Sequence, residues 1–435
     1  MPRSDARALE PGGLPASYAA VAGARTHWLG ARQSEARAAF ETLEMPTWRR
    51  GRGWSLRPEP LRLEPYAPLA EAPGRLGADD ADRDAIALLD GRVVGLPAHP
   101  PEGIEIIPLG PDAPEILPAA AEAWLGTLVG PAAGKLEALN LAAMTGGAVV
   151  RVRRGAHPDA ALRIVQRVTR DDVASLPRLV VVVEEGADAS VVEECLDGAG
   201  GRTRALVDAV VEIHLGAGAH LSYVDVTELG PEAKGIARRR ARLERDSHLE
   251  WTSGVFGGGF LSLAWDTILA GSGARLDATG VYLSKGREQH ALVSDTWHRV
   301  PSTEADVHFR GAVFGHCGSV FDGIIRTDSS AKGTLSHLGD HLLFLSPNAH
   351  ADSIPALLIE GDDVKVGHGA TIGRVDPDQI YYLGARGIDP EAAREMLVIG
   401  YFEPTLARIP DEALRESQRA TIRRLVLDSR EGARA

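Results

Sequence analysis

Four short segments in the middle of the chain approximate one pattern, small-x-small-x-apolar: Ala187-Asp188-Ala189-Ser190-Val191, Ala217-Gly218-Ala219-His220-Leu221, Arg245-Asp246-Ser247-His248-Leu249 and Ser272-Gly273-Ala274-Arg275-Leu276. Their apolar residues lie at positions 191, 221, 249 and 276, in steps of 30, 28 and 27 residues. A near-constant period among short β-like runs is typical of a solenoid, where each coil buries its apolar face against its neighbours. The small residues suit corners, where the chain turns tightly.

The sequence around these segments also favours strands. From Gly147 onward, β-branched runs such as Leu179–Val183 and Ala209–Ile213 are punctuated by Gly, Asp and Ser, and helical periodicity is absent until about Asp376. Apolar residues make up 44% of the chain but aromatic residues only 5%, which indicates a core of aliphatic side chains. A β-sandwich is the alternative to a solenoid at this point.

The N-terminal part reads differently. Residues 1 to 45 carry helical spacing, with Ala36, Ala39, Phe40 and Leu43 on one side, and Met45-Pro46 is expected to end that helix. Residues 50 to 120 hold many prolines and short runs such as 92–96, so they suggest a loosely organised or linker-like stretch.

The C-terminal part turns helical. Asp376 can cap a first helix that carries Ile380 and Leu383 and ends near Gly387, and a second helix begins at Asp389-Pro390-Glu391 and runs through Ile399. A third helix is expected over 411–427, with Leu414, Ile422 and Leu425 as its apolar stripe. We therefore expect an N-terminal region over 1–140, a β-core over 141–375 and a helical domain over 376–435.

Charge and cysteine content exclude several classes of protein. The 47 basic and 60 acidic residues give a net charge of −13, which argues against nucleic acid or an anionic membrane surface as the main partner. Two cysteines cannot form a disulfide framework, the N-terminus lacks the regions of a signal peptide, and no apolar run reaches the length of a membrane span. We expect a soluble, cytoplasmic protein.

The most specific stretch is Asp362–Gly373, DDVKVGHGATIG, followed by Tyr382-Leu383 and Arg386-Gly387-Ile388. It resembles the C-terminal signature of the SufD branch of the SufB/SufD family, scaffolds of iron–sulfur cluster assembly. The resemblance covers roughly residues 135 to 400 and extends only loosely to 48–54. SufB carries a cysteine in the segment that matches Ser346–Ala349 and E-H-E-A where this chain has Gly367–Ala370, so the SufD branch fits better.

The resemblance implies a fold and a set of partners. The fold is mainly β, a right-handed parallel β-helix core with an N-terminal helical region and a small C-terminal helical domain. The chain would be a non-catalytic subunit that pairs with SufB through its β-core and with the ATPase SufC through its C-terminal helices. It would hold no cofactor stably by itself, whereas the assembled complex would carry a transient iron–sulfur cluster and is a candidate to bind reduced flavin. A homodimer is the alternative assembly.

His368 is the candidate metal-ligating residue, because the matching histidine of the family lies at the SufB interface and is implicated in building the nascent cluster. Gly367 and Gly369 suggest an imidazole that projects from a turn, and imidazole nitrogen suits iron. The alternative is a histidine that only stabilises the turn. Two departures weaken polar functions near His368: Leu358 stands where the family commonly has Glu, and Val366 where Cys or Ala is frequent.

Other chemistry-bearing residues favour structural roles. Eleven of the 14 histidines follow residue 200, and we expect His337, His341 and His350 to be dispersed over different coils or faces. Cys317 and Cys195 are too few for a stable cluster, and Cys195 is expected to be structural. Gly257-Gly258-Gly259 lacks the order of a phosphate-binding loop and predicts a β turn.

Two other classes of function stay open. A β-helical carbohydrate-active enzyme would need a catalytic carboxylate cluster and usually a secretory signal. A self-associating structural solenoid would form homo-oligomers that have no effect on cluster assembly. Association with an ATPase distinguishes the scaffold from both.

Overall fold

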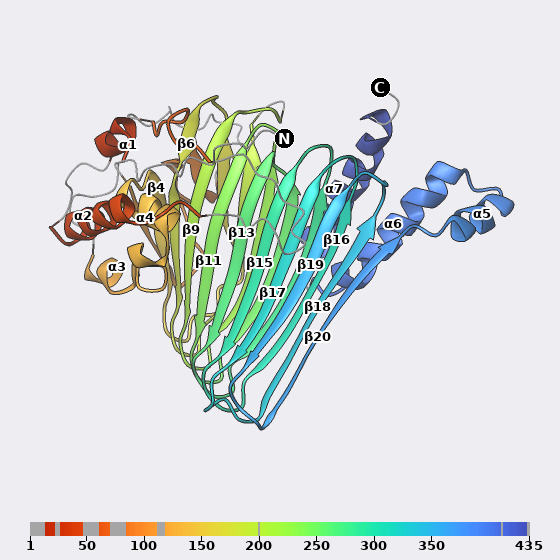
Figure 1. The fold of residues 1–435 in the computed structure, drawn as a ribbon. Coiled ribbons are helices and arrows are strands. Elements are labelled where there is room, and N and C mark those ends of the chain that lie inside the picture. The colour runs from red at the N-terminus through yellow and green to blue at the C-terminus, as the bar shows by residue number, and fades with distance from the viewer. Residues whose placement is uncertain are drawn as a thin grey trace, which may run out of the picture.

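The chain folds into two large β-sheets that face each other, with helices at both ends (Figure 1). The computed structural model describes residues 14–21, 27–46, 61–69, 84–110, 118–198, 201–409 and 412–432. The mainly β class and the parallel β-solenoid expected from the sequence are confirmed.

Sheet 1 runs in the order β2-β1-β5-β8-β10-β12-β14-β16-β18-β20. Its strands are β1 (Ala85–Leu89), β2 (Arg92–Gly95), β5 (Leu162–Val168), β8 (Asp188–Asp197), β10 (His220–Leu229), β12 (His248–Gly257), β14 (Arg275–Ser284), β16 (Glu304–Val313), β18 (Thr334–Phe344) and β20 (Val364–Arg374). From β1 to β20 the pairing is parallel.

Sheet 2 runs in the order β19-β17-β15-β13-β11-β9-β7-β4-β3, and β6 also pairs with β9. Its strands are β3 (Ile104–Leu109), β4 (Gly146–Val152), β6 (Val173–Ser175), β7 (Pro177–Val183), β9 (Ala205–Leu215), β11 (Lys234–Leu243), β13 (Phe260–Leu269), β15 (Gln289–His298), β17 (Gly318–Thr327) and β19 (His350–Ile359). Consecutive strands alternate between the sheets from β8 onward, so each coil contributes one strand to each sheet.

The corners between sheet 2 and sheet 1 explain the small residues of the repeated segments. In each of four successive corners a backbone N–H bonds to the carbonyl three residues earlier: Ala187 to Glu184, Ala219 to Gly216, Ser247 to Glu244 and Ala274 to Gly271. The third residue of each turn has a positive φ: Gly186, Gly218, Asp246 and Gly273, between +57° and +78°. Such a turn favours Gly or Asp at this position, which is the unspecified second position of the last three segments and lies just before the first one.

The repeat itself is confirmed for three of its four members. Leu221 pairs with Leu249, and Leu249 with Leu276, all facing the core between the sheets. The first step is wrong by two residues, because Leu221 pairs with Ala189 and not with Val191. Side chains alternate along a strand with a period of two, so Ala189 and Val191 both face the core and the apolar pattern cannot tell them apart.

Residues 84–110 differ from the loosely organised stretch that the prolines suggest. β1 pairs with β5 and with β2 in sheet 1, and β3 pairs antiparallel with β4 in sheet 2. Both sheets therefore begin before residue 140.

Helices cover the outer side of sheet 2 near its N-terminal edge (Figure 1). They are α1 (Ala16–Val21), α2 (His27–Thr42), α3 (Ala119–Trp124), the 3₁₀ helix η1 (Pro131–Ala133) and α4 (Lys135–Ala142). Of the stripe expected here, Ala36 and Phe40 are buried, at 0% and 2% exposure, whereas Ala39 and Leu43 are half-buried, and α2 ends before Pro46. The stretch 48–54, which loosely resembles the family, lies outside the described residues.

Three helices follow β20: α5 (Pro377–Ala385), α6 (Pro390–Leu406) and α7 (Glu412–Gly432). Asp376 and Asp389 cap the first two, since each side chain accepts hydrogen bonds from backbone N–H groups of the first turn. The second helix continues past Ile399 and includes Pro404.

α6 and α7 pack onto the outer face of sheet 1 at the carboxyl ends of its strands. Phe402 and Ile422 from the helices share one apolar cluster with Phe256, Val281 and Leu283. The expected stripe of the last helix is confirmed, because Ile422 and Leu425 are buried and Leu414 packs against the same cluster.

The core also contains one buried ionic group, which we call the Arg239 network. Arg239 of sheet 2 lies with its Nε 3.2 Å from Glu193 and 3.7 Å from Asp225, both on sheet 1. The Tyr223 hydroxyl donates to Glu193 at 2.7 Å, and the Trp251 indole N–H donates to Asp225 at 2.8 Å. A charge buried between the sheets is thus compensated across the core.

Candidate functional site at the open end of the solenoid

The solenoid has an open end at β19 and β20. Within the described residues β19 pairs only with β17, and β20 only with β18, whereas the strands before them are paired on both sides. Two strands of about the usual solenoid length therefore present unpaired backbone groups along one edge of each sheet. Figure 1 shows this end beside the C-terminal helices.

His368 lies in the middle of β20, aligned with the buried Leu338 of β18. Thr371 faces outward, where its hydroxyl lies 2.6 Å from Nδ1 of His341, so alternation places His368 on the core-facing side together with Val366. The expectation of a turn is wrong. His368 is exposed because no further coil in the described part of the chain covers β20, and not because of the flanking glycines.

Gly367 and Gly369 lie on the outer face, where they leave room beside the histidines. A Cβ at Gly369 would meet nothing within 4 Å, and one at Gly367 would lie 4.0 Å from Nδ1 of His337. Neither glycine is required sterically by its own strand. Of the two departures from the family, Val366 packs against the core beside His368, whereas Leu358 of β19 is 49% exposed.

Three histidines gather on the outer face near this end, contrary to the expected dispersal. His337 and His341 lie on the same face of β18, and the ring of His308 on β16 lies 5.3 Å from that of His337. A Cβ at Gly339 would lie 3.3 Å, 3.5 Å and 3.7 Å from ring nitrogens of His308, His337 and His341. Burial, and then the nearby Arg310 and histidines, lower the pKa of His341. The strand period of two puts residues 337 and 341 on one side, whereas His350 lies on β19 of the other sheet.

A buried carboxyl lies just inside the open end. Asp340 faces the core from β18, and its Oδ1 accepts a hydrogen bond of 3.1 Å from the Tyr282 hydroxyl. Burial raises the pKa of Asp340 from 3.8 to about 6, although the hydroxyl groups of Ser353 and Tyr282 oppose the shift in part.

The cysteines are not positioned as ligands. Cys195 and Cys317 are free and buried, on β8 and directly before β17, and the Cys317 thiol donates to the Ser284 carbonyl at 3.3 Å. Burial raises the pKa of both thiols to about 12, which keeps them protonated near neutral pH.

The triple glycine forms a turn, as expected. It joins β12 to β13, with φ at +71° for Gly257 and +82° for Gly258. A Cβ at Gly257 would lie 2.1 Å from the Leu229 carbonyl oxygen, so only glycine fits there.

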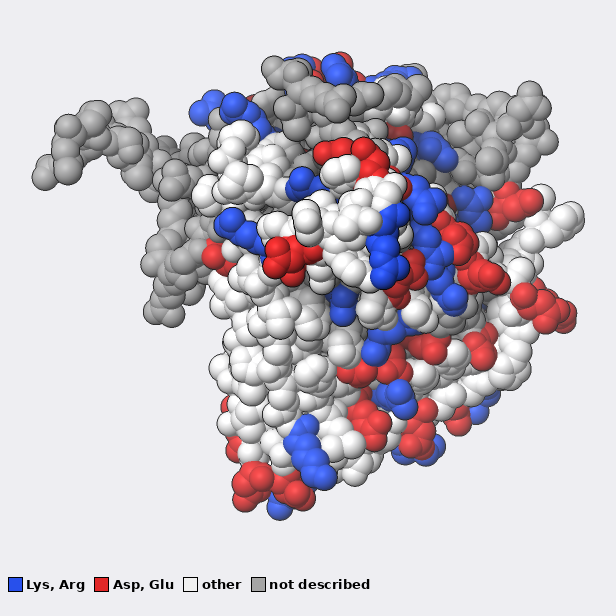
Figure 2. All heavy atoms as spheres, turned by 90° about the vertical axis from the view of Figure 1, so that its right-hand side faces the viewer, with Lys and Arg blue, Asp and Glu red and all other residues white. Residues whose placement is uncertain are grey.

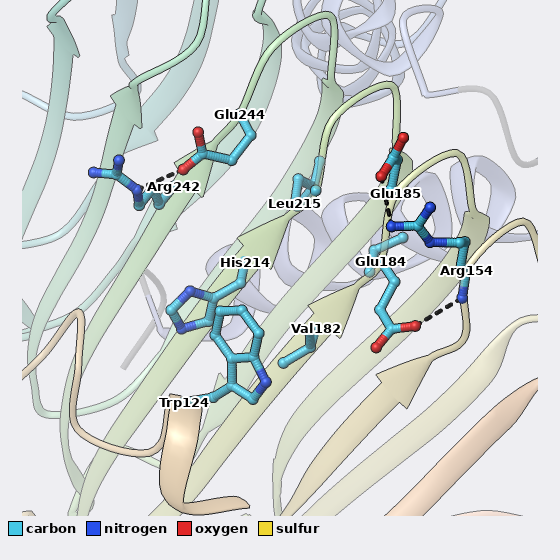
Figure 3. Close-up of a pocket in the computed structure, with 11 residues that line it drawn as sticks. Trp124, Arg154, Val182, Glu184, Glu185, His214, Leu215, Arg242 and Glu244 are labelled. Atoms are coloured by element: carbon cyan, nitrogen blue, oxygen red, sulfur yellow. Dashed lines mark hydrogen bonds and ion pairs between the residues drawn. The ribbon is translucent and has the colours of Figure 1, made fainter. Parts of the chain in front are cut away.

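A separate pocket of about 340 Å³ lies on the outer face of sheet 2 along β7, β9 and β11, far from the open edge strand β19 in the order of that sheet (Figure 3). Trp124 and His214 form one wall, with ring centroids 4.7 Å apart, and burial lowers the pKa of His214 to about 4. The charged groups at its rim are paired with one another, Arg154 with Glu185 and Arg242 with Glu244. The sequence interpretation missed this pocket because Trp124 lies outside the strands.

The C-terminal helices offer a second exposed surface. No residue of α5 is buried, and Tyr381 and Tyr382 are 79% and 57% exposed, as is Met396 of α6 at 54%. Arg310 ties α6 to β16, because its guanidinium donates to the Tyr401 carbonyl and stacks over the Tyr401 ring. Within the described part of the chain, no helix is both long and apolar enough to cross a bilayer.

Comparison with known proteins identifies relatives of this chain. The model of the SUF system FeS cluster assembly SufBD core domain matches residues 166–401. The iron–sulfur cluster assembly protein SufD of Bacillus subtilis is 29% identical over 293 residues, which cover 67% of this chain and 67% of that protein. An iron–sulfur cluster assembly SufBD family protein of Staphylococcus epidermidis is 27% identical over 297 residues. That match spans 68% of this chain but only 63% of the staphylococcal protein, less than two thirds of its length.

The matched residues include most of both sheets and the open end with His368. The range matched by the family model includes the motif at residues 362–373. The chain therefore belongs to the SufB/SufD family of the SUF iron–sulfur cluster assembly system and is SufD-like.

Proposed function

We propose that this chain is a scaffold subunit of a cytoplasmic SUF complex, which pairs with SufB through the open end of its solenoid and with the ATPase SufC through its C-terminal helices. The observation that carries the proposal is that β19 and β20 each have one edge with no neighbouring strand among the described residues. Natural proteins rarely leave long edges uncovered, because unpaired N–H and C=O groups template association with another chain.

A second solenoid fits this edge better than a loop or a peptide. Both sheets stop at the same end, so a related solenoid could continue both at once. Apolar side chains are exposed there, with Ile372 at 57% and Ile359 at 39%. On the side that carries this end, uncharged residues form a broad band down the left of Figure 2, whereas most charged residues lie to its right.

His368 would contribute one ligand to the cluster that is built in this interface. Its side chain points toward the core-facing side of β20, where a partner's coil would enclose it. The buried, protonated thiols of this chain leave sulfur ligation to the partner. ATP hydrolysis is assigned to SufC, and binding of reduced flavin by the assembled complex stays a prediction.

The surface assigned to SufC is α5, together with the exposed side of α6. Removal of everything from Asp376 onward is a poor test of this assignment, because α6 and α7 cover Phe256, Val281 and Leu283 and the truncated core would expose them. Substitutions on α5 leave that packing intact.

The test is co-expression with the SufB and SufC proteins of the same genome, followed by measurement of subunit stoichiometry and iron content. Ile372→Asp should abolish SufB binding and keep SufC, whereas Tyr381→Asp combined with Tyr382→Asp should abolish SufC binding and keep SufB. Leu96→Asp, which changes another exposed leucine at 41% exposure, is the matched control and should keep both.

Other outcomes would favour the alternatives. A homodimer that survives Ile372→Asp and excludes SufB would support a self-associating solenoid. Cleavage of a polysaccharide by the purified chain would support an enzyme.

A further inference from the structure

Two histidines and a glutamate converge on the outer face of sheet 1, away from His368. His220 is the first residue of β10 and His248 the first of β12, and the two pair directly. Glu250 follows two residues after His248, and since Leu221 and Leu249 face the core, all three side chains face outward. One ligand atom from each lies within 4.8 Å of the others.

One ring nitrogen of this group has no hydrogen-bond partner. Nε2 of His220 lies 3.7 Å from Oε2 of Glu250, is shielded from solvent and has no hydrogen-bond partner. The rings of His220 and His248 are stacked with centroids 5.0 Å apart. Two imidazoles and one carboxylate held this close place three potential ligand atoms around one position for a cation.

Flanking carboxylates orient both rings. Nδ1 of His220 lies 3.2 Å from Asp188 on β8, and Nε2 of His248 lies 2.7 Å from Asp277 on β14. With Asp188 beside Nδ1 of His220 and Asp277 beside Nε2 of His248, the second nitrogen of each ring, Nε2 of His220 and Nδ1 of His248, is the one left to face a metal ion. Metal-binding histidines usually have this carboxylate partner.

We propose that His220, His248 and Glu250 form a binding site for a divalent first-row transition metal ion, with Asp188 and Asp277 as positioning residues. Two imidazole nitrogens and one carboxylate oxygen are the donor set of mononuclear Fe(II) and Zn(II) sites, and three protein ligands leave coordination positions open for water or an exchanging ligand. Mg²⁺ and Ca²⁺ prefer all-oxygen sites and fit poorly. Arg275, which donates to Asp277 at 2.8 Å, neutralises part of the nearby negative charge and favours an exchangeable ion over a permanently held one.

The site is distinct from the open end. Four strand spacings of roughly 4.8 Å separate β12 from β20, so His248 and His368 are roughly 19 Å apart along the sheet. α6 and α7 cover the carboxyl ends of these strands, whereas His220 and His248 stand at the opposite, amino ends.

The experiment is titration of the full-length chain, stripped of metal with a chelator, with Co(II) and Zn(II). Calorimetry gives affinity and stoichiometry, and the visible absorption of Co(II) reports nitrogen and oxygen ligation. We expect one site per chain, with binding weakened at least about tenfold in His220→Ala, His248→Ala and Glu250→Gln. Asp188→Asn should weaken binding about 10- to 100-fold through the orientation of His220.

His316→Ala, which removes an exposed histidine outside the site, is the matched control and should bind as the unmodified chain does. Circular dichroism and urea unfolding establish that each variant is folded, and Glu250→Gln retains the size of the side chain. Absence of Co(II) binding would overturn the proposal. Binding that is unchanged in the three ligand variants but lost in His337→Ala would also overturn it, by assigning the metal to the other histidine group.

Discussion

Strands β11 and β20 have nearly the same length and the same parallel, in-register pairing, yet their core-facing side chains differ in how far they are buried. β11 lies between β9 and β13, and its core-facing residues such as Ala241 and Leu243 are fully buried. Among the residues that the structure describes, β20 pairs with β18 alone, and its core-facing Ile372 is 57% exposed. Burial in a solenoid is therefore set by the next coil and not by the strand's own sequence.

The two regions also treat buried charge differently. In the middle, Arg239 compensates Glu193 and Asp225 across the core. Near the end, Asp340 is equally buried, but the side chains that lower its pKa, Ser353 and Tyr282, are neutral. In the middle coils, residues of the chain itself compensate the buried charge. In the last coils, the burial of side chains depends more on what covers the open end.

The largest change in the free energy of unfolding should come from disrupting the Arg239 network in the middle coils. Arg239→Ala leaves two carboxylates uncompensated in the core and should lower the free energy of unfolding by about 3–5 kcal/mol in urea denaturation. Arg242→Ala on the same strand is the control, since its side chain is 39% exposed and pairs with Glu244 at the surface. Its expected cost is about 0.2–1 kcal/mol. Equal costs would mean that the network contributes nothing beyond a surface ion pair.

The stability of the coil that contains β18 should depend on pH through Asp340. The pKa of Asp340 is raised to about 6 in the fold, so between pH 4 and pH 6 the folded protein binds more protons than the unfolded chain, and stability falls as pH rises. This contribution is on the order of 2–3 kcal/mol, and Asp340→Asn should abolish it because the amide does not titrate. Unfolding free energies measured from pH 4 to pH 7 test this.

The control for that experiment is Asp362→Asn, which removes an exposed carboxyl from the turn before β20. A pH profile of Asp340→Asn that parallels the unmodified protein would show that Asp340 is already ionised in the fold.

The smallest effect on stability should come from the open end itself. His368→Ala removes an exposed side chain and should change the free energy of unfolding by about 0.5 kcal/mol or less, while iron content of the complex with SufB falls. Leu338→Ala is the matched control one strand inward, and this buried truncation should cost about 2–5 kcal/mol. If His368→Ala instead unfolds the chain and iron loss merely follows protein loss, His368 is structural.

Part of the candidate site could be predicted from the sequence, and part could not. The motif at 362–373 identified His368, but the flanking glycines suggested a turn where the structure has an edge strand. The two histidines of the proposed metal site could have been predicted from the sequence. His220 and His248 occupy the same place in two successive repeated segments, each directly before the aligned leucine. Treating the histidines as dispersed hid that signal. Glu250 and Asp188 carry no signal of their own until the register is known.

The sequence by itself determined a strand-rich core with a repeat, the caps of the C-terminal helices and, through the motif at 362–373, the family and its solenoid, because these depend on local periodicity and short motifs. Only the tertiary structure decided which residues share a level across neighbouring strands, since a shift of two residues leaves every side chain on the same face, as Ala189 and Val191 show. It also decided that Asp340 is buried beside the neutral Ser353 and Tyr282 and that His368 is exposed on a core-facing side. Both outcomes depend on where the stack of coils ends, and contacts between distant parts of the chain determine that.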